Sequence, residues 1–150
     1  MRRSSRWTDD SGSAAVEFVT AGLVLLVPLV YLVIAMSSIQ AGALAAEGAA
    51  RQAARVFVQA TSVADARAAA ERAVQFALAD HGVESAETTV TISCRPSPDD
   101  CLQRRGLVTV EVSVAVPLPL MPPAITADIP LSVTLEAAAT QQVSRFRDEG

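Results

Sequence analysis

The longest apolar stretch of the chain lies near its beginning, where no residue from Phe18 to Ile39 is charged. A run of this length and composition is typical of a helix that spans a bilayer. An alanine-rich segment without strong helix breakers follows it, so the pattern predicts one helix over 14–59, half in lipid and half outside. Pro28 removes one backbone hydrogen bond and is expected to bend this helix without breaking it.

A second helix is predicted after a short polar break. Ser62 followed by Asp65 fits a capping box, with Asp in place of the usual Glu, and Gly82 after His81 is a typical helix stop. One face between these signals is apolar, which indicates a buried side. This stripe comprises Val63, Ala66, Ala70, Ala73, Val74, Ala77 and Leu78.

Alternation with a period of two replaces the helical period in the second half of the chain. The clearest strand is 107–116, in which the valines at even positions share one face, and shorter strands are expected near 89–94 and 129–136. The proline-rich segment 117–123 cannot be an interior strand, because proline lacks the backbone donor. The fold class is therefore α+β, with the second helix packed on a small three-stranded antiparallel sheet.

The charges that flank the apolar run set its orientation. Arg2, Arg3 and Arg6 precede it closely, whereas the first basic residues after it are Arg51 and Arg55. The positive-inside rule therefore places the N-terminus in the cytoplasm and the C-terminal domain outside a cell membrane that the chain crosses once. The expected parts are a cytoplasmic leader (1–12), a transmembrane helix (13–40), an extracytoplasmic α+β domain (41–140) and a flexible C-terminal tail (141–150).

Composition argues against several classes of function. The net charge of −4 and the lack of a basic stripe disfavour a nucleic-acid binder. His81 is the only histidine, so no Ser/His/Asp, Cys/His or metal-ligand arrangement is available, and no glycine-rich phosphate loop is present. We therefore expect no catalytic residue, metal site, cofactor or small-molecule substrate, and the chain is not expected to be an enzyme.

The two cysteines, Cys94 and Cys101, flank a turn-forming sequence that contains two prolines. Outside the membrane, a local disulfide that closes this loop is the expected use of the pair. Two free buried cysteines are the alternative.

Glu17 is a single carboxylate directly before the apolar run. It lies between two small residues, Gly12 and Ser13, and the aromatic residue Phe18. It could be an ordinary interfacial carboxylate that faces the positive end of the helix dipole. However, a carboxylate at the edge of an apolar span is costly to insert and tends to mark function.

These residues resemble the cleavage and assembly signal of type IV-like prepilins. Within that class, the chain most resembles the TadE-like family of minor pilin-like proteins of the bacterial tight-adherence pilus system. The residues that carry the resemblance are Gly-Ser-Ala-Ala-Val-Glu-Phe at 12–18, the apolar helix, and Ala-Ala-Arg-Gln-Ala-Ala-Arg at 49–55. Beyond residue 55 the resemblance is only architectural.

The resemblance implies that a prepilin peptidase cuts after Gly12 and that the product helps to assemble or anchor a thin surface pilus. Other pilin-like subunits, the pilus assembly machinery and membrane lipid would be its partners. Such a cut would free an α-amine on Ser13, and Glu17 of a neighbouring subunit could supply its counter-charge. The pair would be tolerated in an apolar assembly better than either charge alone.

Other assignments remain open at this stage. Arg51 and Arg55 could bind carboxylates of a partner or lipid phosphates, or could form a solvated helix face on which Glu47 pairs with Arg51. The chain could instead be secreted after cleavage at Ala41-Gly-Ala43, or be a plain single-pass anchor that presents a small binding domain. The first residue of the mature protein distinguishes these readings: Ser13 for the pilin-like subunit, Leu44 for the secreted protein and Met1 for the anchor.

Overall fold

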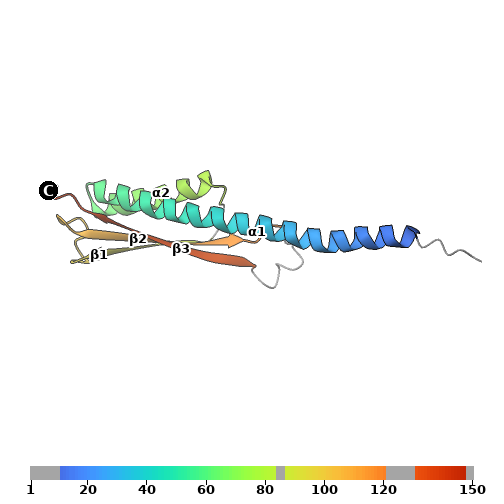
Figure 1. Ribbon diagram of the computed structural model, residues 1–150. Coiled ribbons are helices and arrows are strands. Elements are labelled where there is room, and N and C mark those ends of the chain that lie inside the picture. The colour runs from blue at the N-terminus through green and yellow to red at the C-terminus, as the bar shows by residue number, and fades with distance from the viewer. Residues whose placement is uncertain (1–10, 84–86, 121–130, 148–150) are drawn as a thin grey trace, which may run out of the picture. The chain divides into compact units, whose positions relative to one another are not determined.

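A computed structural model describes residues 11–83, 87–120 and 131–147 of the chain (Figure 1). It has the expected α+β class, with two helices followed by three strands. The chain divides after Met36 into an N-terminal unit and a second unit that begins with Ser37, called the head domain below. The elements are α1 (Ser11–Gln59), α2 (Val63–Asp80), β1 (Thr88–Arg95), β2 (Leu107–Pro117) and β3 (Ser132–Gln142).

In the N-terminal unit, the described residues all belong to the first part of α1. The helix continues through Pro28 without a break, as expected, and the bend there stays a prediction. Large apolar side chains are exposed along this part, from Val16 to Met36. Within the described residues, α1 is the one helix that is long and apolar enough to cross a membrane.

The head domain contains an antiparallel sheet with the strand order β1-β2-β3. β2 lies in the middle, so that Val110 is opposite Ile92 of β1 and Ala139 of β3. The predicted alternation in β2 is confirmed, because its even-numbered valines are all buried and its odd-numbered residues are not. These valines form the centre of the core.

The third strand differs from its prediction. Positions 129 and 130 lie outside the described residues, and β3 continues to Gln142, six residues beyond the expected end at Glu136. Its second half is rich in alanine and glutamine, which are poor strand signals, but pairing with β2 fixes it in the sheet.

The chain beyond residue 140 also differs from the flexible tail that is expected over 141–150. Gln141 and Gln142 belong to β3, and Val143 is buried, with its N–H donating to the carbonyl of Gly106 at 2.8 Å. An apolar side chain and a continued ladder therefore hold this segment against the sheet. Residues 148–150 of the expected tail lie outside the described residues.

Both helices cover one face of the sheet in the head domain (Figure 1). The sequence predicted only α2 as the cover, and its buried stripe is confirmed, with Ala66, Ala70, Val74 and Leu78 at its centre. The second part of α1 adds a buried row that is made almost entirely of alanine. This row comprises Ala45, Ala46, Ala49, Ala50, Ala53, Ala54 and Phe57.

At Gly42, α1 approaches the sheet closely. It is buried, and a Cβ atom at this position would lie 2.6 Å from Cγ2 of Val116 and 3.0 Å from Cδ1 of Leu135. The missing side chain therefore lets the helix pack directly on β2 and β3.

The predicted ends of α2 are confirmed. The Asp65 N–H donates to Oγ of Ser62 at 3.1 Å, and this hydroxyl donates to the Asp65 carboxylate at 2.8 Å. At the other end, Gly82 has a φ of 67°, and the N–H groups of Gly82 and Val83 donate to the carbonyls of Ala79 and Leu78. This pair of bonds is the Schellman arrangement that glycine favours after a helix.

Candidate functional site

The residues of the predicted processing signal lie at the start of α1. Gly12 and Ser13 are its second and third residues, and Glu17 is its seventh. The side chains of Glu17 and Phe18 are exposed, that of Phe18 by 80%. The favourable effect of the helix dipole on a carboxylate is strongest in the first turn, so it would stabilise Glu17 only weakly if α1 begins at Ser11.

Glu17 has no basic neighbour on its own helix. The positions one turn away are Ser13, Ala14, Thr20 and Ala21, and the next charged residue of α1 is Glu47. The Thr20 hydroxyl donates to the carbonyl of Val16 at 2.8 Å, not to the carboxylate. Within the described part of α1, no basic side chain therefore lies close enough to neutralise Glu17.

Arg51 and Arg55 lie on the part of α1 that belongs to the head domain. Arg51 donates to the Glu47 carboxylate at 3.2 Å, as expected, and the two side chains are 64% and 54% exposed. Arg55 is also exposed. Neither arginine is used in the core, so both guanidinium groups can reach a partner.

Cys94 and Cys101 form a disulfide, with their Cα atoms 5.1 Å apart. Both cysteines are buried at the end of β1 and in the loop that follows it. The loop also contains a cis peptide bond between Arg95 and Pro96. The predicted disulfide is thus present in the structure, in place of two free thiols.

Arg147 has a role that the sequence did not reveal. Its guanidinium donates to the carbonyls of Val58 at 3.3 Å and Thr61 at 3.1 Å, and also to that of Ala60. Its own carbonyl accepts a hydrogen bond of 2.7 Å from Nε of Arg104. Arg147 therefore satisfies carbonyls at the end of α1 from the opposite end of the chain.

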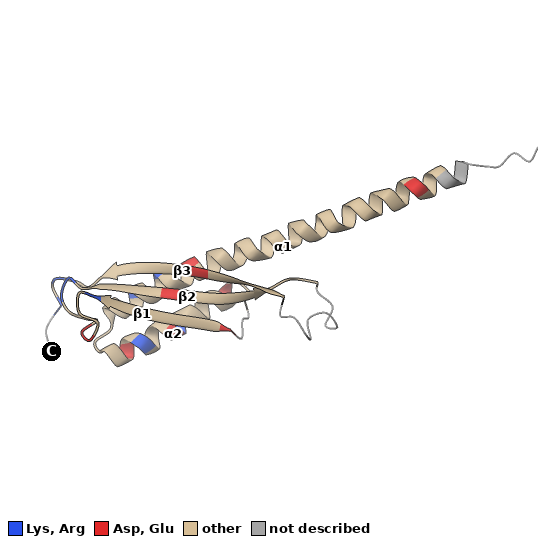
Figure 2. Cartoon of the chain, turned by 90° about the horizontal axis from the view of Figure 1, so that it is seen from below, with Lys and Arg blue, Asp and Glu red and all other residues tan. Residues whose placement is uncertain are grey.

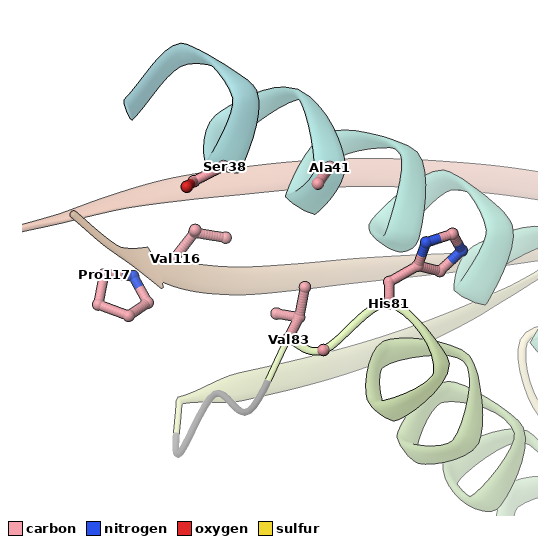
Figure 3. Close-up of a pocket in the computed structure, with 7 residues that line it drawn as sticks. Ser38, Ala41, His81, Val83, Val116 and Pro117 are labelled. Carbon is pink, nitrogen blue, oxygen red and sulfur yellow. The ribbon is translucent and has the colours of Figure 1, made fainter. Parts of the chain in front are cut away.

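A cavity of about 400 Å³ opens between the two helices and the end of β2. In Figure 3 the Ser38 hydroxyl and the His81 imidazole lie at different ends of its lining, so they do not form a nucleophile–base pair. In the described part of the chain, no three potential metal ligands come together. Besides Ser38 and His81, the lining residues are Ala41, Gly82, Val83, Val116 and Pro117.

No protein-family model, curated protein or solved structure matches this chain. The resemblance to TadE-like proteins therefore rests on residues 12–18 and 49–55 and on the apolar helix between them.

Proposed function

We propose that this chain is a TadE-like minor pilin-like subunit, which a prepilin peptidase cuts after Gly12 and which helps to assemble or anchor a tight-adherence pilus. The observation that carries the proposal is the isolation of Glu17. It is exposed on an apolar helix and is the only charged residue of α1 before Glu47. A carboxylate in such a place is costly in lipid unless a cation neutralises it.

Cleavage after Gly12 would create that cation. The new α-amine on Ser13 lies four residues before Glu17, which is about 6 Å along a helix, so the two groups differ in depth by about one turn, and the Glu17 side chain can span part of this difference. In neighbouring subunits that lie side by side, the amine of one chain can therefore meet the carboxylate of the next. Each subunit would use its carboxylate for one neighbour and its amine for another.

The packing of Gly42 supports retention of the helix over secretion. Cleavage at Ala41-Gly-Ala43 would remove Gly42 from the secreted product, and with it the close packing of α1 on Val116 and Leu135. The described residues offer no comparable observation in favour of a plain membrane anchor.

The test is the first residue of the protein isolated from membranes of cells that also express a prepilin peptidase. The proposal predicts Ser13 for the wild type and an uncut Met1 or Arg2 start for Gly12→Leu, because the peptidase requires a small residue before the scissile bond. A Met1 start for the wild type would favour the plain anchor, and Leu44 would favour the secreted protein. Either result would overturn the proposal.

A further inference from the structure

The sheet face turned away from the helices carries two isolated carboxylates. Glu111 of β2 and Glu136 of β3 are both exposed, and the register makes them diagonal neighbours, because Glu111 is opposite Ala138. Figure 2 shows these acidic bands on the two strands. Within the described residues neither carboxylate has an ion-pair partner. The other residues of the face are mostly small or hydroxylated: Thr89, Thr91, Ser93, Thr109, Ser113, Ala115, Thr134, Ala138 and Thr140.

The basic residue on the same face of β1 is too far away to neutralise them. Arg95 lies opposite Leu107, four positions from Glu111 along β2, which is about 13 Å. Two like charges on adjacent strands repel each other, so a cation brought by another molecule would relieve an unfavourable arrangement.

The opposite surface of the head domain carries two exposed arginines. Arg51 and Arg55 lie on the side of α1 turned away from the sheet, since Ala50, Ala53 and Ala54 are the buried residues beside and between them. Arg55 has no ion-pair partner within the described residues, and Arg51 shares the exposed carboxylate of Glu47.

Each of these arginines lies within about 3 Å, in height along the head domain, of one of the two carboxylates. The contact of Gly42 with Val116 fixes the alignment of α1 with β2, which run side by side (Figure 1). Glu111 lies five residues from Val116 along β2, which is a distance of about 17 Å. The same distance along α1, measured from Gly42, reaches Ala53. Glu136 lies opposite Ser113, which is three residues from Val116, and the corresponding distance along α1 from Gly42 reaches Ala49.

We propose that copies of this chain stack with α1 of one copy on the outer sheet face of the next, so that Arg51 and Arg55 meet Glu136 and Glu111. This inference rests on the proposed function, in which all copies cross one membrane in the same direction. When two head domains stack in parallel, Arg51 and Arg55 face Glu136 and Glu111 with an axial offset of about 3 Å, which flexible side chains can span. Each copy offers both surfaces, so the contact can repeat from copy to copy, as growth of a filament requires.

Complementary charges at such a contact set partner and register more than raw affinity. The test is therefore a charge exchange between two copies of the full-length chain that carry different affinity tags, expressed together and isolated from membranes in mild detergent. One variant, Arg51→Glu with Arg55→Glu, reverses the charge of the helix surface. The other, Glu111→Arg with Glu136→Arg, reverses the charge of the sheet surface.

Each variant paired with itself should lose co-isolation of the two tags by about tenfold or more, because like charges then face each other. The two variants expressed together should recover co-isolation to within about twofold of the wild type, since a helix surface of one again meets a complementary sheet surface of the other. Recovery also shows that both variants are folded. A matched control, Arg67→Glu with Arg72→Glu on α2, should leave co-isolation unchanged.

Wild-type copies that do not co-isolate, or variants that fail to rescue each other, would overturn the stacking. An effect of the arginine variant on membrane retention alone would point to lipid phosphates and would also overturn it. A Ser13 start of the mature wild-type chain in the same preparations would show that the proposed function survives such a failure.

Discussion

The guanidinium of Arg147 donates a hydrogen bond of 3.3 Å to the backbone carbonyl of Val58, 89 residues earlier in the chain. The end of α1 is thereby joined to the segment that follows β3. Because charged donors form stronger hydrogen bonds than neutral ones, this contact is expected to contribute to the stability of the head domain.

Arg147→Ala should lower the free energy of unfolding by about 1–2 kcal/mol, because carbonyls at the end of α1 lose a charged donor. Thermal unfolding of the full-length chain in detergent measures the change. Arg145→Ala is the matched control, since the Arg145 guanidinium stacks on the exposed ring of Phe146, 4.5 Å from its centroid, and caps no helix. Equal unfolding temperatures for the two variants would contradict the role of Arg147.

Two glycines of α1 should respond in opposite ways to substitution by alanine. A Cβ atom at Gly42 would meet Cγ2 of Val116 at 2.6 Å, whereas nothing lies within 4 Å of one at Gly48. Gly48→Ala should stabilise the chain by about 0.5–1 kcal/mol through helix propensity. Gly42→Ala should lower the free energy of unfolding, because overpacking costs about 1–3 kcal/mol, which is more than the gain from helix propensity. The same sign of change for both variants in thermal unfolding would show that α1 does not approach the sheet so closely.

The disulfide should be detectable in protein isolated from cells. Alkylation without a reductant should label neither Cys94 nor Cys101, and Cys94→Ala with Cys101→Ala should lower the free energy of unfolding by about 2–3 kcal/mol, at the low end for a short loop. Mass spectrometry of the alkylated chain provides the first measurement. Quantitative labelling of both thiols would contradict the pairing.

The elements that the sequence predicted best are those with strong local signals. The valines at even positions of β2 and the cap of α2 at Ser62 depend on near neighbours in the chain, and both are in the structure as expected. The second half of β3 is different, because Ala137 and Ala139 carry little strand preference and belong to the sheet through their pairing with β2.

Contacts between distant segments could not be read from the chain. The alanines that make α1 a good helix former also form its sheet-facing side, but alanine does not indicate which side that is. In the sequence, Arg147 is one of several charged residues near the C-terminus, and its position does not indicate a contact with Val58. In the candidate site, Gly12, Ser13 and Glu17 could be identified from the sequence, and the structure adds that Glu17 is exposed on α1.

The central claim is that Glu17 acts in assembly, as the counter-charge of the Ser13 amine of a neighbouring subunit. The most direct measurement is the recovery of pilin-like partner subunits with tagged Glu17→Ala, compared with wild type and with Thr20→Ala as the control one turn away. The account predicts that Glu17→Ala is cut after Gly12 and inserted normally, because loss of a charge makes insertion easier. Recovery of partners should nevertheless fall by about a hundredfold or more, since an unpaired buried charge costs about 3–5 kcal/mol. Equal recovery of partners with Glu17→Ala and wild type would contradict the account.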